Sequence, residues 1–488
     1  MSAAAIGKNH WTSAIDFSSE TFANAPQPSG HANLIDESST PVLSPSGSPH
    51  HWNSSQPIES KVRSYRMSSP VVFQRVLANL NDDNNHKHLP SIELDPSSAL
   101  SDPFEAFLMR RFVEDVAPLM NLYAFDSVFT HILPWLALHE RVLFDSIMAI
   151  SAWGVHAQRP GSVSRDIPEQ YKMRALAAIR DNLETSPYYR KLLHLCSSLI
   201  ILLYNILASD TTTLLVDLNI AYHKIKELFV GRPPASSQND GPNDLFPICV
   251  GLSFSLDLVI SFRFDVCCCW EPDFLQAIFE NERLPRSYTN EWWLQMGFLL
   301  LVRINHFTHR CHVPTYQEYL ENARLAEWTA IYNDLLDYGR LLPQPLRPMA
   351  QIPSLQGTFP SIHVFDEYSM LANVTYHAGV IMALHVRPGM TLSELVTVPP
   401  GTRDHAIQIM GLLKTCDKPF FWITIYWAHK SAASCITDQT ERDEALELSC
   451  QYEWQTGFTF EMHLKAIQSR WTILDTASIP QPGGNDNS

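Results

Sequence analysis

Apolar residues recur at steps of three and four along residues 104–156, and this period constrains the fold more than any other feature of the chain. Such spacing is typical of an amphipathic α-helix that packs one face on a core. The segment therefore predicts a helix, a passage broken at Leu133-Pro134, and a second helix. The apolar face of the second helix is formed by Leu143, Ile147, Ile150 and Trp153.

Helical patterns continue along the rest of the chain. Asp102 followed by Pro103 fits an N-cap and a first helical residue. Only Phe421–Tyr426 has an alternation that suggests a strand, so the sequence predicts an all-α fold, a large multi-helix domain. The expected helices are 169–184 (with Met173, Leu176 and Ile179 near one face), 191–208 (apolar nearly all round and therefore central), 216–230, and a closing helix with Phe460, Leu464, Ile467, Trp471 and Leu474 in one stripe.

Composition divides the chain into three parts. Residues 1–98 are rich in Ser, Pro and Asn and lack sustained apolar periodicity, so we expect a disordered N-terminal segment. Residues 99–478 are expected to form the helical domain, and residues 479–488 a flexible tail. Within the domain, proline- and glycine-rich composition predicts connectors at Gly231–Pro247, Leu341–Pro360 and Arg387–Thr402.

The net charge of the chain is −16, from 35 Lys and Arg against 51 Asp and Glu. Affinity for nucleic acid comes mostly from cations that neutralise phosphates, so a chain this acidic is poorly suited to grip DNA or an anionic membrane through its whole body. Residues 192–208 and 249–264 are apolar but are shorter than the about 20 residues of a membrane span, and both contain polar residues. We expect buried helices there.

The cysteines point to an intracellular protein. There are 9, an odd number with no C-x2-C pair, which fits reduced thiols better than a secreted disulfide framework. No apolar run follows Met1, so no signal peptide is expected.

Two clusters invite a chemical interpretation. His306 and His309, followed by Cys311 and His312, have helical metal-ligand spacing, but no carboxylate accompanies them and Arg310 opposes a cation. A polar helix end is the favoured interpretation. Three side chains at Cys267–Cys269 cannot face one ion on a helix, because successive residues point about 100° apart. Buried packing is favoured over lipidation there.

Known catalytic motifs are missing from the sequence, including nucleophile elbows, phosphate-binding loops and H-E-x-x-H. We therefore expect no enzymatic activity, no catalytic residues, no metal and no cofactor.

The order of residue types resembles the fungal-specific transcription factor regulatory domain family, and within it the acriflavine-sensitivity control type branch. An aromatic-rich helix, the Leu133-Pro134 pair and a run of small and aliphatic residues open the match. The later segments are Gly297 with the helix after it, Tyr368–Val386, Phe420–Trp422, Thr440–Asp443, and Arg470-Trp471 with Asp475.

The resemblance implies an all-helical regulatory domain that acts in the nucleus on secondary-metabolite or stress-response genes. Implied partners are the transcription machinery or a DNA-binding regulator, with no membrane. Sterol-sensing relatives hold an apolar ligand in this domain, so a small apolar ligand is a further implied partner. The alternative is an auxiliary small-molecule-binding protein or enzyme on the same core.

One feature departs from the family pattern. Relatives commonly carry six cysteines near the N-terminus that bind two zinc ions, whereas the first cysteine here is Cys196. Either the chain regulates without its own contact to DNA, or a zinc-cluster exon is missing from it.

Overall fold

The structure is a computed structural model, and all its described residues belong to Val72–Ser488, the second of the two units of the chain. The expected disordered segment 1–98 and the expected tail 479–488 lie outside the described residues. The described residues are 100, 102–121, 128–159, 161–180, 188–208, 213–230, 245–281, 289–310, 317–354, 357–391, 394, 397–418, 421–456 and 460–477.

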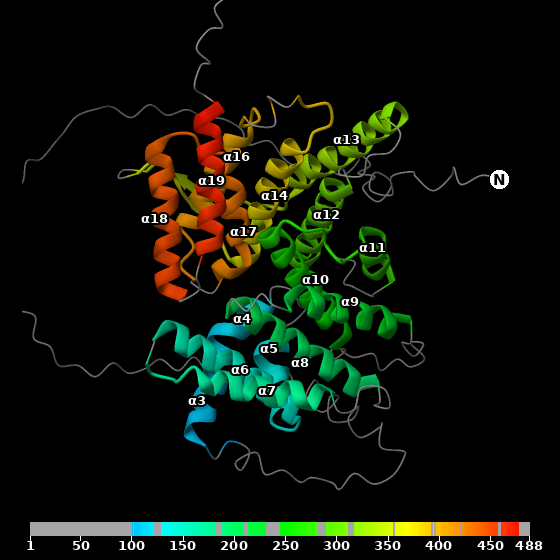
Figure 1. Ribbon diagram of the computed structural model, residues 1–488, viewed down its shortest axis with the longest axis vertical. Coiled ribbons are helices and arrows are strands. Elements are labelled where there is room, and N and C mark those ends of the chain that lie inside the picture. Colours follow the sequence, from blue (N-terminus) through cyan, green and yellow to red (C-terminus); the bar gives the residue numbers. More distant parts are fainter. Residues whose placement is uncertain are drawn as a thin grey trace, which may run out of the picture. The chain divides into compact units, whose positions relative to one another are not determined.

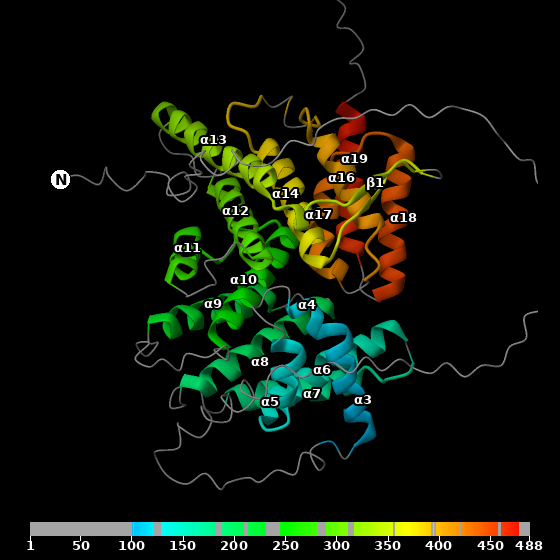
Figure 2. The same ribbon diagram turned by 180° about the vertical axis from the view of Figure 1, so that it is seen from behind.

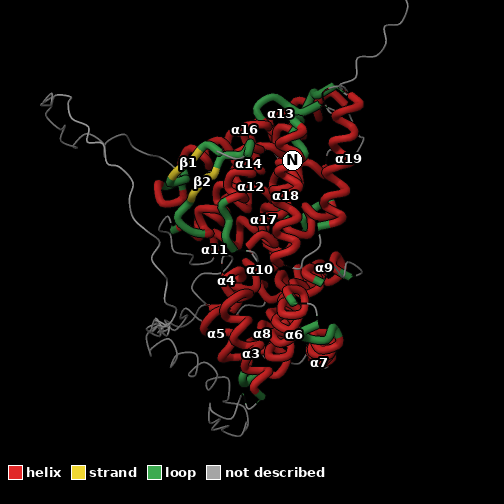
Figure 3. Tube along the Cα trace, turned by 90° about the vertical axis from the view of Figure 1, so that its left-hand side faces the viewer, coloured by secondary structure: helices red, strands yellow, loops and turns green. Residues whose placement is uncertain are grey.

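The all-α prediction is confirmed: helices account for nearly all regular structure in the described part of the chain (Figure 3). The helices are α3 (Pro103–Arg111), α4 (Ala117–Asn121), α5 (Val128–Ala137), α6 (Arg141–Gln158), α7 (Asp166–Arg180), α8 (Tyr188–Leu207), α9 (Leu214–Val230), α10 (Leu245–Phe264), α11 (Pro272–Asn281), α12 (Asn290–Arg310), α13 (Gln317–Leu341), α14 (Glu367–His385), α16 (Thr402–Lys414), α17 (Trp422–Ala433), α18 (Gln439–Thr456) and α19 (Glu461–Ala477). Shorter elements are the π-helical turn η3 (Phe112–Val116), the 3₁₀ turn η4 (Gln344–Leu346), and the strands β1 (Ala350–Ile352) and β2 (Ser361–His363).

The first described helix begins where the sequence predicts. The Asp102 carboxylate accepts a hydrogen bond from the Phe104 N–H at 2.8 Å, and Pro103 is the first helical residue. The expected break at Leu133-Pro134 is wrong, because Pro134 lies inside α5. Burial of Leu133 and Leu136 against the neighbouring α4 and α6 outweighs the helix-breaking tendency of proline.

Helices α6, α7 and α8 lie side by side (Figure 1). Helix α8 is the one described helix long and apolar enough to cross a membrane, and most of its apolar window is buried inside the protein. This agrees with the prediction that it is central. On α7, Met173 is 59% exposed, which corrects the predicted face. The predicted Ile179 is buried and Leu176 is half-buried, while Tyr171 and Ala175 take the place of Met173 on the buried face.

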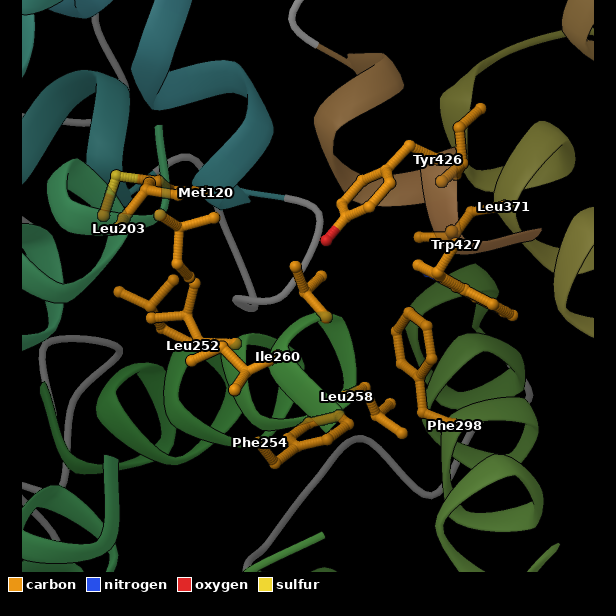
Figure 4. Packing of buried hydrophobic residues seen from close by; sticks show 14 of the residues in the cluster. Met120, Leu203, Leu252, Phe254, Leu258, Ile260, Phe298, Leu371, Tyr426 and Trp427 are labelled. Atoms are coloured by element: carbon orange, nitrogen blue, oxygen red, sulfur yellow. The ribbon is translucent and has the colours of Figure 1, made fainter. Parts of the chain in front are cut away.

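Helix α14 packs against α12, α13, α16 and α17, which are drawn together in Figure 2. Gly297 makes the approach of α12 possible, because a Cβ atom there would lie 2.7 Å from the Tyr338 Oη atom and 2.9 Å from Thr375 Cγ2. Between α10 and α17, buried side chains such as Ile260, Tyr426 and Trp427 belong to one apolar core (Figure 4).

The predicted extended connector 341–360 agrees with the structure in its described residues: it contains the short turn η4 and the strand β1, and β1 pairs antiparallel with β2, which follows the connector directly. Two other predictions change. The predicted strand Phe421–Tyr426 is wrong, because Trp422 begins α17 and a short apolar run fits a buried helix as well as a strand. Leu245–Pro247 belong to α10 rather than to a loop, and the rest of that predicted loop lies outside the described residues.

The closing helix is confirmed as α19, with Ile467 and Leu474 buried, Leu464 half-buried, and buried Phe460 directly before its first residue. Trp471 is 6% exposed, and its indole N–H donates to the Ala433 carbonyl at 2.8 Å. The Arg442 guanidinium lies 5.2 Å from the centre of a Trp471 ring and pairs with Asp475 at 2.9 Å. These contacts attach α19 to α17 and α18.

Candidate functional site

Three consecutive cysteines lie in the turn Cys267–Trp270, which follows α10. Asp265 adopts a left-handed conformation with φ of +54°, and the Val266 N–H donates to the Ser261 carbonyl at 3.0 Å. This backbone arrangement is a common way to end a helix. It turns the chain sharply, so that the three cysteines lie between α10 and α12.

A buried carboxylate organises the inner side of the turn. Asp257 in α10 is fully buried and accepts hydrogen bonds from the Trp270 N–H at 2.9 Å and from the Ser261 hydroxyl at 3.2 Å. The Cys269 backbone N–H and thiol also donate to it. Burial raises the pKa of Asp257 to about 6, although these hydrogen bonds oppose the shift.

Two residues of α12 hold the outer side of the turn. The Asn305 amide accepts from the Cys268 N–H at 2.8 Å and donates to the Val266 carbonyl at 3.1 Å. The Nε2 atom of His306 lies 2.8 Å from the Trp270 carbonyl oxygen. A carbonyl only accepts, so Nε2 carries the proton and Nδ1 is left with a lone pair. That lone pair faces the Cys267 sulfur at 3.7 Å.

The thiols of the turn are kept protonated. Burial is the main cause, and the negative charge of Asp257 acts in the same direction on all three thiols. Together they raise the pKa of Cys267, and they raise the pKa of Cys269 to about 12. The pKa of Cys268 is raised well above its ordinary value. Burial lowers the pKa of His306, so the imidazole is neutral at physiological pH. A protonated thiol is a poor nucleophile, so this arrangement does not provide a catalytic thiolate.

The structure joins two motifs that the sequence interpretation kept apart. His306 lies near the end of α12, as expected, and is a half-buried partner of the turn. The three thiols have separate partners: Cys267 faces His306, Cys268 faces Ser261 and Cys269 faces Asp257. Cys268 is buried as expected, whereas Cys267 is exposed. Cys311 and His312 lie outside the described residues.

Sequence reasoning missed Asp257 as a site residue. The one hint in the sequence was that Asp257 is the single carboxylate in a helix that is mostly apolar. Within the described ranges, no group of three or more His, Cys, Asp and Glu side chains could hold a metal ion.

A buried histidine pair joins the last three helices. His429 donates from Nε2 to the Ala445 carbonyl at 3.0 Å, so its Nδ1 accepts from His463 Nε2 at 3.1 Å. Burial lowers the pKa of His429 to about 4. Burial and the nearby charges of Lys430 and Arg263 keep the pKa of His463 well below its ordinary value.

A surface pocket of about 350 Å³ lies at the start of α14. Its wall includes buried Met370 and Phe421 and exposed Phe365. Glu367 and Lys418 form an ion pair at its edge.

Comparison of the chain with protein-family models, with curated proteins and with solved structures found no match.

Proposed function

We propose that this chain is a transcriptional regulator that works through its helical domain, in the manner of the fungal regulatory domains that its sequence resembles. Its targets would be secondary-metabolite or stress-response genes, and it would act in the nucleus. The proposal assigns it a binding role rather than catalysis. The turn Cys267–Trp270 supports this choice, because its thiols are protonated and a protonated thiol is a poor nucleophile.

The observation that carries the proposal is the mutual packing of the segments responsible for the resemblance. Gly297 allows α12 to approach Tyr338 and Thr375, the latter in the small-residue segment Tyr368–Val386. Arg442 of the acid-arginine segment packs on Trp471. Segments that match in order along the chain therefore also act as contacts of one helical domain.

We propose that contact with DNA is indirect, through a protein partner of the transcription machinery or a DNA-binding regulator. The net charge of −16 supports this, because phosphate binding requires clustered cations. Titration of the full chain against duplex DNA at physiological salt should give weak binding without sequence preference. Nanomolar, sequence-specific binding would contradict an indirect role.

A tethering experiment tests the regulatory role directly. The full chain is fused to an unrelated DNA-binding module whose site lies upstream of a reporter gene, and the module alone is the control. We expect the fusion to change reporter expression, and transcript profiles to change when the gene is deleted. A fusion that enters the nucleus without changing the reporter, together with an unchanged transcript profile, would refute the proposal.

The surface pocket supports a second candidate, a small-molecule-binding protein. Its volume of about 350 Å³ is at the lower end of the range for ligand sites, about 300–1,000 Å³. Glu367 and Lys418 at its edge provide charged groups beside the apolar Met370 and Phe421. Met370→Trp would fill the pocket, so loss of ligand-induced thermal stabilisation in that variant would favour this candidate.

A further inference from the structure

We propose that Cys267 and His306 form a two-coordinate binding site for a soft monovalent metal ion, of which Cu(I) is the biological example. The site would connect the turn after α10 to α12. The proposal is independent of the regulatory role, because it depends only on the geometry of these two side chains.

The two donor atoms already face each other. The Cys267 sulfur lies 3.7 Å from His306 Nδ1. With bond lengths like those in zinc sites, about 2.3 Å to sulfur and about 2.0 Å to nitrogen, one metal ion can bridge donors up to about 4.3 Å apart. The observed separation therefore accommodates one ion in a bent arrangement, and a small rotation of the exposed Cys267 side chain would straighten it.

The imidazole is oriented as a metal ligand. Histidines that bind metals usually donate their other ring N–H to a carbonyl or carboxylate, which fixes the ring and the tautomer. His306 does this through Nε2 and the Trp270 carbonyl, at 2.8 Å. Its Nδ1 lone pair is thereby presented to Cys267 before any ion arrives.

The choice of ion follows from the type and number of ligands. A thiolate with an imidazole suits copper, and soft sulfur favours Cu(I). Zinc in structural sites takes four ligands, and among the described residues the other two thiols of the turn have partners of their own, Cys268 near Ser261 and Cys269 on Asp257. Two ligands satisfy Cu(I), a closed-shell ion that accepts linear or bent two-coordination.

The charge balance also fits. On binding, the Cys267 S–H bond breaks, a sulfur–copper bond forms and the proton leaves to solvent, so the local charge is unchanged and no electron is transferred. Asp257 and Glu271 are the acidic groups near the pair and favour a cation, although Glu271 is itself paired with Lys226 at 3.3 Å. Arg310 opposes a cation, but its guanidinium is paired with Glu327 at 3.7 Å.

The test titrates the reduced full chain with Cu(I), supplied as its acetonitrile complex without oxygen, against a chromophoric Cu(I) chelator. We expect one tightly bound Cu(I) per chain. We expect Cys267→Ser and His306→Gln each to weaken binding more than about tenfold, with unchanged helical circular dichroism. X-ray absorption of the complex should show one sulfur and one nitrogen neighbour.

Matched controls are Cys450→Ser, which removes another exposed thiol, and Cys311→Ser, which removes the next thiol along from His306. Both should bind Cu(I) like the unmodified chain. Unchanged affinity in Cys267→Ser or in His306→Gln would overturn the proposal. Loss of the site in Cys311→Ser, or Zn²⁺ binding at the same residues with higher affinity than Cu(I), would also overturn it.

Discussion

Replacing Trp471 with alanine should remove much of the stability of the helical domain. The side chain is 6% exposed, and truncating a buried tryptophan costs about 3–5 kcal/mol. The Ala433 carbonyl would lose one of its two donors and keep the Ile436 N–H at 3.1 Å. The Arg442 guanidinium, on a residue that is only 4% exposed, would lose the ring it packs on. We expect a loss of about 4 kcal/mol, against a total of about 5–15 kcal/mol for a typical domain.

Urea unfolding followed by far-ultraviolet circular dichroism measures this loss, through the shift of the unfolding midpoint at constant slope. Trp454→Ala is a matched control, because Trp454 is 84% exposed on α18 and its removal should change stability by less than about 0.5 kcal/mol. Trp471→Phe keeps most of the ring and loses the N–H donor, so it should fall between the two. If Trp471→Ala costs less than about 1 kcal/mol, α19 does not stabilise the domain and the packing argument is wrong.

Three further outcomes are expected. Because burial lowers the pKa of His429 from 6.5 to about 4, the unfolded chain binds more protons in that range, so stability should fall as pH drops from 6.5 to 4. This loss should be smaller in His429→Gln, as pH-dependent urea melts would show, and equal losses would refute it. Gly297→Ala should lower the unfolding midpoint by an amount equivalent to about 1–3 kcal/mol, since the new methyl group would meet Tyr338 and Thr375; a stabilised variant would show that α12 shifts freely. The buried Tyr338 hydroxyl has no hydrogen-bond partner among the described residues, so Tyr338→Phe should be neutral or raise the thermal midpoint, and a clear loss would reveal a partner.

Periodicity and capping signals were sufficient to predict the helices with strong local patterns. The Asp102-Pro103 start of α3 and the stripe that ends in Leu474 are both local, because one helix determines which of its residues share a face. Pro134 and Phe421–Tyr426 were misjudged because burial on several sides decided their conformation. A local pattern contains no information about what covers it.

The candidate site also depends on contacts that local sequence patterns do not reveal. Both Cys267–Cys269 and His306 stood out in the sequence, yet their pairing did not. They are separated by 39 residues, and their contact depends on how α10 packs against α12. Asp257 was less conspicuous still, because one carboxylate in an apolar helix has no motif. Its importance appears only when the turn that it supports is seen folded over it.

The burial of α8 also has a consequence for how the chain is made. Helix α10 packs against α8, as in the 3.8 Å contact between Cys249 Sγ and the Leu192 carbonyl. Because α10 follows α8 in the sequence, it leaves the ribosome later. During that interval a helix of membrane-spanning length and hydropathy lacks part of its partner surface. A nascent chain stalled between α9 and α10 should therefore be a substrate for chaperones that bind apolar segments, whereas one released after α10 should not.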